Sequence, residues 1–193
     1  SGVRCQIWIV FLIAISTFAP QSFAGFLEIG ASSNYRRSTI NEYNFQESLS
    51  FTGSVSYYFW EQSAIELSYT DGYSQVVSGL EGGLERKTES EFQMIGLDLV
   101  FAFGSRQDAF QPYVKAGAAQ LSRQIAFQIE GQEKQISPES EGIVPSTGIG
   151  IKLRLSKTFS LKLGIDAWTT PPAEGSDETV VDYAGRAGVS WFL

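Results

Sequence analysis

Hydrophobic and polar side chains alternate regularly in the stretch from Ser48 to Trp60, SLSFTGSVSYYFW. Successive side chains of a β-strand point to opposite faces, so this period of two predicts a strand with one apolar and one hydroxyl-lined face. From Leu49 to Phe59 an extended strand measures about 36 Å, at about 3.3 Å per residue. Tilted by about 45°, it spans about 25 Å, the height of the apolar band of an outer-membrane barrel. The strand is therefore long enough to span such a band, although alternation alone does not separate a membrane barrel from a soluble one.

The same alternation recurs after Gly25 and predicts eight strands. Their expected ranges are Phe26–Arg36, Ser48–Trp60, Ala64–Tyr73, Glu91–Phe103, Tyr113–Ile129, Val144–Leu155, Phe159–Thr169 and Val180–Leu193. The connections at Glu61, Gly104 and Ser156 are short and the other four are longer, as in outer-membrane barrels with short periplasmic turns and long external loops. We therefore predict an all-β fold: an eight-stranded antiparallel up-and-down transmembrane β-barrel.

The fifth strand departs from a single alternation. Val114, Ala116 and Ala118 are apolar at even positions, whereas Ile125 and Phe127 are apolar at odd positions. A β-bulge inserts one residue and changes the face that follows it, so we predict a bulge near Gln120–Gln124.

The polar faces of the strands carry five acidic and five basic residues, which suit a closed and mutually neutralised interior. This candidate ion network is Glu28, Glu66, Asp98, Lys115, Lys152, Arg154, Lys162, Asp166, Asp182 and Arg186. Seven glycines share this face, which favours the narrow interior of an eight-stranded barrel over a solvated surface. The charges either pair and plug the barrel or line a narrow conduit, and the plug is the favoured interpretation.

The apolar faces would then meet lipid. The expected lipid-facing residues are Leu49, Phe51, Val55, Tyr57, Phe59, Leu97, Leu99, Phe101, Ile149, Ile151, Leu161, Leu163, Val189 and Trp191. Aromatic residues near the short turns resemble the interfacial girdle of such barrels. We assign to this girdle Tyr57, Phe59, Phe103, Tyr113, Phe159 and Trp191.

Residues 1–24 differ from the rest of the chain. Arg4 is their only charge, Ile7 to Ala19 is nearly all apolar, and Ser22-Phe23-Ala24 has the small residues of a cleavage site. These features predict a cleaved signal peptide at 1–24 and an outer-membrane barrel domain at 25–193. The single cysteine, Cys5, lies in the leader, so disulfides and thiol chemistry are not expected in the mature chain.

Three segments carry a resemblance to known barrels: AIELSY (Ala64–Tyr69), PYVKAGAA (Pro112–Ala119) and YAGRAGVSWFL (Tyr183–Leu193). The chain resembles the small eight-stranded outer-membrane barrels, the OmpA-like and opacity-protein-like group, over essentially all of 25–193. The resemblance implies that the assembly machinery recognises the last strand by its alternating apolar residues and terminal aromatic. Here Phe192 is penultimate and Leu193 is last. A second, peptidoglycan-binding domain is not expected.

The amino-acid composition limits the enzyme activities and binding partners that can be expected. The chain has no histidine. The enzymes known among barrels of this architecture resemble one another in using histidine as the general base, so we predict no enzyme activity. Paired loop acids such as Glu139 and Glu141 would be the remaining catalytic alternative. The formal net charge of −7, or −8 without Arg4, argues against a nucleic-acid partner, which needs a basic patch. No cofactor is expected, and no spacing typical of a calcium loop occurs.

Three functions remain open, with a surface display role favoured. The leading hypothesis is a structural anchor in outer-membrane lipid that displays three acidic loops to an unknown surface partner, since function concentrates in loops. From Asp71 to Glu91, for example, five acids stand against two bases. The alternatives are a narrow channel for small solutes or ions, and a soluble lipocalin-like ligand binder.

Overall fold

The computed structural model describes residues 26–41, 44–79, 85–105, 108–129, 135–170 and 180–193. Nine β-strands lie in these ranges: β1 Phe26–Asn41, β2 Asn44–Tyr58, β3 Ser63–Gly79, β4 Glu85–Ala102, β5 Phe110–Ile129, β6 Gln135–Ile136, β7 Ser140–Arg154, β8 Phe159–Thr170 and β9 Val180–Phe192. None of the elements in this part of the chain is a helix able to cross a membrane.

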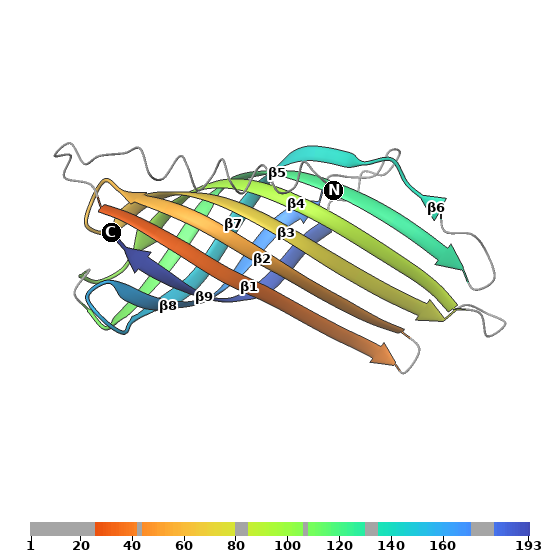
Figure 1. The fold of residues 1–193 in the computed structure, drawn as a ribbon, viewed down its shortest axis with the longest axis horizontal. Helices are drawn as coiled ribbons and strands as arrows, with labels where there is room; N and C mark the ends of the chain where they lie inside the picture. Colours follow the sequence, from red (N-terminus) through yellow and green to blue (C-terminus); the bar gives the residue numbers. More distant parts are fainter. Residues whose placement is uncertain (1–25, 42–43, 80–84, 106–107, 130–134, 171–179) are drawn as a thin grey trace.

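Eight long strands form a closed antiparallel barrel, which confirms the predicted architecture (Figure 1). Each pairs with its sequence neighbour, β4 pairs with β5, and β1 pairs with β9 to close the wall. Closure gives every strand two neighbours and so satisfies the backbone groups that an open edge would expose. The two-residue β6 only adds to the free side of β5 at Ala126 and Phe127.

The short turns gather at one end of the barrel, near the carboxyl terminus (Figure 1). Between β2 and β3, the backbone N–H groups of Trp60 and Ser63 each donate to the other residue's carbonyl oxygen. Gly104, between β4 and β5, has a φ of 99°, a left-handed conformation that glycine adopts without steric cost. These turns lie where the sequence predicts them.

At the opposite end, the strands run further than the side-chain alternation indicates. We expected Ser74–Ser90 to be a long loop, but β3 and β4 stay paired as far as Gly79 and Glu85. Likewise β1 and β2 pair as far as Asn41 and Asn44. The hydrogen-bond ladder uses backbone groups alone, so it continues where the side chains no longer alternate. Most of the expected acidic loop of Asp71–Glu91 is therefore strand, whereas residues 171–179 of the last expected loop lie outside the described residues.

The bulge predicted near Gln120–Gln124 is wrong. β5 pairs without a shift with β4 from Tyr113 to Ile129, and with β7 from Phe110 to Arg123. Ile125 and Phe127 keep the inward parity of Lys115. Both residues lie beyond the part of β5 whose outward residues are apolar. The expectation that inward residues are polar holds only within that part, so it does not apply to Ile125 and Phe127.

Candidate functional site

The barrel is polar inside and apolar outside. Nine of the residues that we expected to face lipid point outward with exposed fractions between 38% and 63%: Leu49, Phe51, Tyr57, Phe59, Leu97, Leu99, Phe101, Ile149 and Trp191. The other five share their faces and are half-buried between neighbours: Val55, Ile151, Leu161, Leu163 and Val189. The candidate functional site is the opposite face, where charged side chains are buried in the lumen.

Glu28 on β1 is the deepest charge, with none of its surface exposed. One carboxylate oxygen accepts from Lys152 Nζ at 2.6 Å, and the other lies 2.8 Å from Lys162 Nζ. Tyr58 donates its hydroxyl to Glu28 at 2.7 Å and accepts from Lys152 Nζ at 2.6 Å. Side chains from β1, β2, β7 and β8 therefore meet in one cluster across the barrel.

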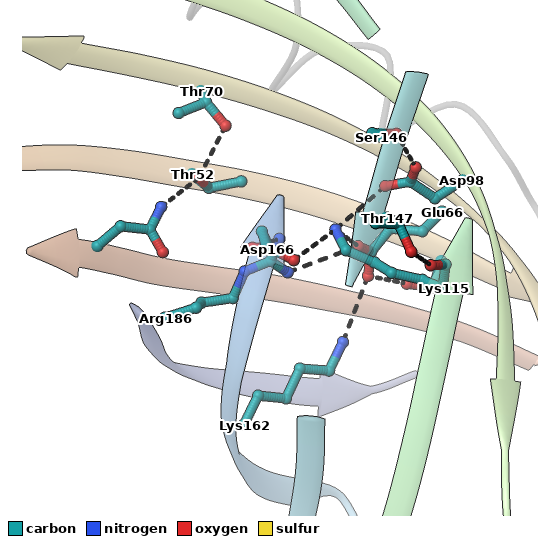
Figure 2. A network of polar contacts seen from close by, with 12 residues as sticks. Thr52, Glu66, Thr70, Asp98, Lys115, Ser146, Thr147, Lys162, Asp166 and Arg186 are labelled. Atoms are coloured by element: carbon teal, nitrogen blue, oxygen red, sulfur yellow. Dashed lines mark hydrogen bonds and ion pairs between the residues drawn. The ribbon is translucent and has the colours of Figure 1, made fainter. Parts of the chain in front are cut away.

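A second cluster is joined to the first through Lys162, and Figure 2 shows Glu66 facing both Lys162 and Lys115. Glu66 lies 3.5 Å from Lys162 Nζ and 3.6 Å from Lys115 Nζ, and Ser56 donates to it at 3.1 Å. Because Lys162 also pairs with Glu28, the two clusters form one continuous ionic network.

Lys115 and Arg186 complete this network toward the outer end. Lys115 Nζ lies 3.1 Å from Asp98 and 3.3 Å from Asp166. Arg186 pairs with Asp166 through Nη2 and lies 3.7 Å from Glu66 through Nη1. Four acids and four bases are thus joined, and their formal charges cancel. They are Glu28, Glu66, Asp98, Asp166, Lys115, Lys152, Lys162 and Arg186.

Two of the ten expected network residues lie elsewhere. Arg154 is at the end of β7, where its guanidinium donates to the carbonyl oxygens of Ser156 at 2.9 Å and Lys157 at 3.2 Å. It holds a turn, because a long side chain at a strand end reaches the nearest free carbonyls. Asp182 precedes Arg186 by four residues on β9 and lies in the wall of a cavity near the outer end.

Apolar side chains also lie at both ends of the ionic network, which the alternation along the sequence does not predict. At the short-turn end, the buried cluster consists of Tyr58, Ala64, Val100 and Tyr113, packed by Ala102 and Phe192. Toward the outer end, it consists of Ala119, Leu121 and Val144, packed by Phe92, Met94 and Trp168. Along β5 the order Tyr113, Lys115, Ala119 places the charge between the two clusters.

The assignment of Tyr113 to the outer girdle is therefore wrong. It has the inward parity of Lys115 and is buried, and an ideal Cβ on Gly150 or Gly164 would lie within 3.0 Å of its phenol. The glycines of β7 and β8 leave the space that this ring occupies. The parity shared by Tyr113 and Lys115 was the available sequence signal.

A hydroxyl network lines the wall opposite the outer apolar cluster. Thr52 and Thr70 share a hydrogen bond of 2.8 Å (Figure 2), and Asn34 donates to Ser50 at 3.1 Å. Two cavities lie in this outer half. One, of about 30 Å³, reaches from Asn34 to Asp98 and Lys115, and the other, of about 50 Å³, lies nearer the mouth between Asn34, Phe92 and Trp168.

The acids of the lumen are paired with bases and are not gathered with one another. Within the described ranges, no group of three or more carboxylate, cysteine or histidine side chains is placed to hold a metal ion. Each acid of the network instead faces a lysine or arginine.

The sequence matches the model of the family described as OprF membrane domain over residues 7–191. The chain belongs to this family. The fold is similar to the N-terminal β-barrel domain of Pseudomonas aeruginosa OprF, with 18% identity, a TM-score of 0.57, and coverage of 90% of this chain and 100% of that one. It is also similar to Neisserial surface protein A, with 15% identity, a TM-score of 0.59, and coverage of 88% and 99%.

Another similar structure is the outer membrane protein OprG from Pseudomonas aeruginosa, with 14% identity, a TM-score of 0.54, and coverage of 88% and 95%. The search among curated proteins found no match. Family and fold together make the protein an integral outer-membrane β-barrel of the OmpA and OprF kind, a group of generally non-enzymatic structural and porin proteins. The soluble lipocalin-like alternative does not agree with this assignment.

Proposed function

We propose that the protein is a structural anchor of the outer membrane, with a closed lumen and an acidic outer rim that meets partners at the cell surface. The ionic network carries the proposal. Its eight charged side chains come from seven strands on all sides of the barrel and cancel one another, so they fill the lumen as a plug.

The apolar clusters strengthen this interpretation. A pore needs a continuous path for water, and apolar residues narrow such a path at both ends, with Val100 and Phe192 at one end and Leu121 and Val144 at the other. Excluding water also lowers the local dielectric, which strengthens each ion pair and raises the cost of breaking one. A plug of this kind stabilises the barrel and opposes conduction.

Planar-bilayer recording tests the closed lumen. We expect purified, refolded protein to give no discrete single-channel steps, while a porin inserted into the same bilayer serves as the positive control. Stable steps from the pure protein would contradict the plug.

The second candidate, a narrow channel for small solutes or ions, is favoured by the two cavities in the outer half of the lumen. The cavity nearer the mouth has no network residue in its wall, whereas four network residues line the other, and together the two would form the vestibule of a conduit. The same recordings decide between the candidates, because a vestibule that ends at a plug conducts nothing.

The display role rests on the outer ends of the strands. Glu91 on β4, Glu141 on β7 and the neighbouring Glu139 are exposed there. Short hairpins and long strands hold these carboxylates on a rigid wall, which suits a surface that meets a partner with positive charge.

Export and assembly complete the proposal. Residues 1–24 act as a cleaved signal peptide, the outward apolar faces contact outer-membrane lipid, and the assembly machinery binds the last strand. The alternation of β9 supports this last point, since Trp191 points outward while Phe192 packs inside against Tyr58, with ring centroids 5.7 Å apart.

A further inference from the structure

Two neighbouring side chains in the lumen carry hydrogen-bonding atoms without a partner. Asn34 on β1 and Arg186 on β9 are directly paired in the sheet, and both point into the barrel. Each is more than nine-tenths buried. Asn34 Oδ1 and Arg186 Nε are both buried without a hydrogen bond, although leaving such a group unsatisfied costs free energy.

The rest of each side chain is fixed. Asn34 Nδ2 donates to Ser50 at 3.1 Å and lies 3.5 Å from Thr52 Oγ1. The terminal nitrogens of Arg186 face Glu66 and Asp166, as Figure 2 shows. The unpaired acceptor of Asn34 and the unpaired donor of Arg186 therefore belong to directly opposite residues on the inner face of the sheet, whose Cβ atoms lie about 5 Å apart.

Both residues lie in the wall of the cavity of about 30 Å³, and Asn34 and Trp168 also line the cavity of about 50 Å³ nearer the mouth. Each cavity exceeds the 10–15 Å³ or so that one water needs, and each is well below the 150 Å³ or so that holds benzene. The space fits a group of a few non-hydrogen atoms. Its apolar side would face Met94, Ala119 and Trp168.

We propose that the cavity wall at Asn34 and Arg186, which we call the cradle, binds one small neutral amide group. This group donates its N–H to Asn34 Oδ1 and accepts from Arg186 Nε through its carbonyl oxygen. An amide carries both a donor and an acceptor, which complement the unpaired acceptor on Asn34 and the unpaired donor on Arg186. A methyl or methylene substituent would lie on the indole of Trp168. The site adds a binding function to the barrel and does not depend on whether the lumen conducts.

The surrounding charges favour a neutral ligand over an anion. Asp98 and Asp166 line the same cavity and balance Lys115 and Arg186, so the net charge of its wall is zero. A carboxylate would also place an acceptor against Asn34 Oδ1, unless the amide turned over and gave up its bond to Ser50. Acetamide and acetate, which have the same size and shape, separate these two chemistries.

Titration of the refolded, isotope-labelled barrel with acetamide tests the cradle by nuclear magnetic resonance. We expect saturable shifts of the Arg186 Nε–H, the Asn34 side-chain amide and the Trp168 indole N–H. Acetate at the same concentrations should leave them unchanged. Asn34→Leu should raise the dissociation constant for acetamide about tenfold, the effect of losing one hydrogen bond.

Arg186→Lys is the second variant, because it keeps the charge that faces Glu66 and Asp166 but lacks the Nε donor, and it should weaken binding as well. Gln124→Leu, an exposed change at the outer end of β5, is the matched control and should bind like the wild type. The absence of a saturable shift, equal binding of acetate, or full binding by both variants would overturn the proposal and leave the space to water.

Discussion

At the scale of single residues, adjacent positions on one strand meet opposite surroundings. Ser54 is buried in the lumen, directly across from Gly30, whereas Val55 has the outward parity and is half-buried in the barrel wall. A hydrophobic substitution and a charged one therefore have opposite costs on the two faces. The barrel is thus the reverse of a soluble protein, with polar residues inside and apolar residues outside.

Val55→Arg should destabilise the barrel by about 2–4 kcal/mol, because it places a charge on the outward face near the middle of the apolar band. Unfolding by urea in lipid vesicles measures the change. Gln124→Arg, beyond the band on β5, is the control and should change the unfolding free energy by less than about 0.5 kcal/mol. Equal costs at both positions would place the membrane band elsewhere.

Glu28→Gln should destabilise the barrel by about 3–5 kcal/mol, since it leaves Lys152 and Lys162 charged and buried without their shared carboxylate. The same urea titration measures this cost. Replacing Glu28 and Lys152 together by methionine should cost less, because no uncompensated charge remains. A double variant that is as unstable as the sum of its single changes would show that the two residues do not interact.

At the scale of elements, the sequence predicts the number, order and short turns of the strands but not their full length. Period-two alternation exists only where one face is apolar, so it ends near Tyr73 although β3 continues to Gly79. The same limit produced the false bulge in β5, whose inner residues turn apolar beyond the band. Pairing of β7 with β8 stops at Ser146, next to Pro145, which lacks the N–H that the ladder needs.

The glycines of β7 supply the element-scale prediction. A Cβ on Gly150 would lie 2.5 Å from the phenol of Tyr113 and 2.5 Å from the carbonyl oxygen of Leu163, so Gly150→Ala should destabilise the barrel by about 1–3 kcal/mol. A Cβ on Gly53 would meet nothing within 4 Å, so Gly53→Ala is the matched control and should be neutral. Urea unfolding of both variants measures the contrast. Equal stability would mean that the ring moves aside freely.

At the scale of the whole molecule, the lumen has an ionic middle between two apolar clusters. Alternation assigns charged residues to one face of each strand, but it does not say which of them meet. Glu28 and Lys152 are 124 residues apart and touch only because the barrel closes. The apolar clusters were missed for a related reason, since residues such as Phe92 and Leu121 break the inside-polar rule that identified the interior.

The outer hairpins give the last prediction, which concerns the display role. Residues 80–84 join β3 to β4, and replacing them with an Asn-Gly turn should leave the barrel intact, because the β3–β4 ladder is complete from Ser63 to Gly79 without them. The unfolding free energy should change by less than about 0.5 kcal/mol, since the closure entropy of a loop depends only weakly on its length. Deleting residues 67–69, inside the membrane band, is the control and should abolish assembly into vesicles. If the shortened hairpin also fails to assemble, the outer ends are needed for folding and are not a free display surface.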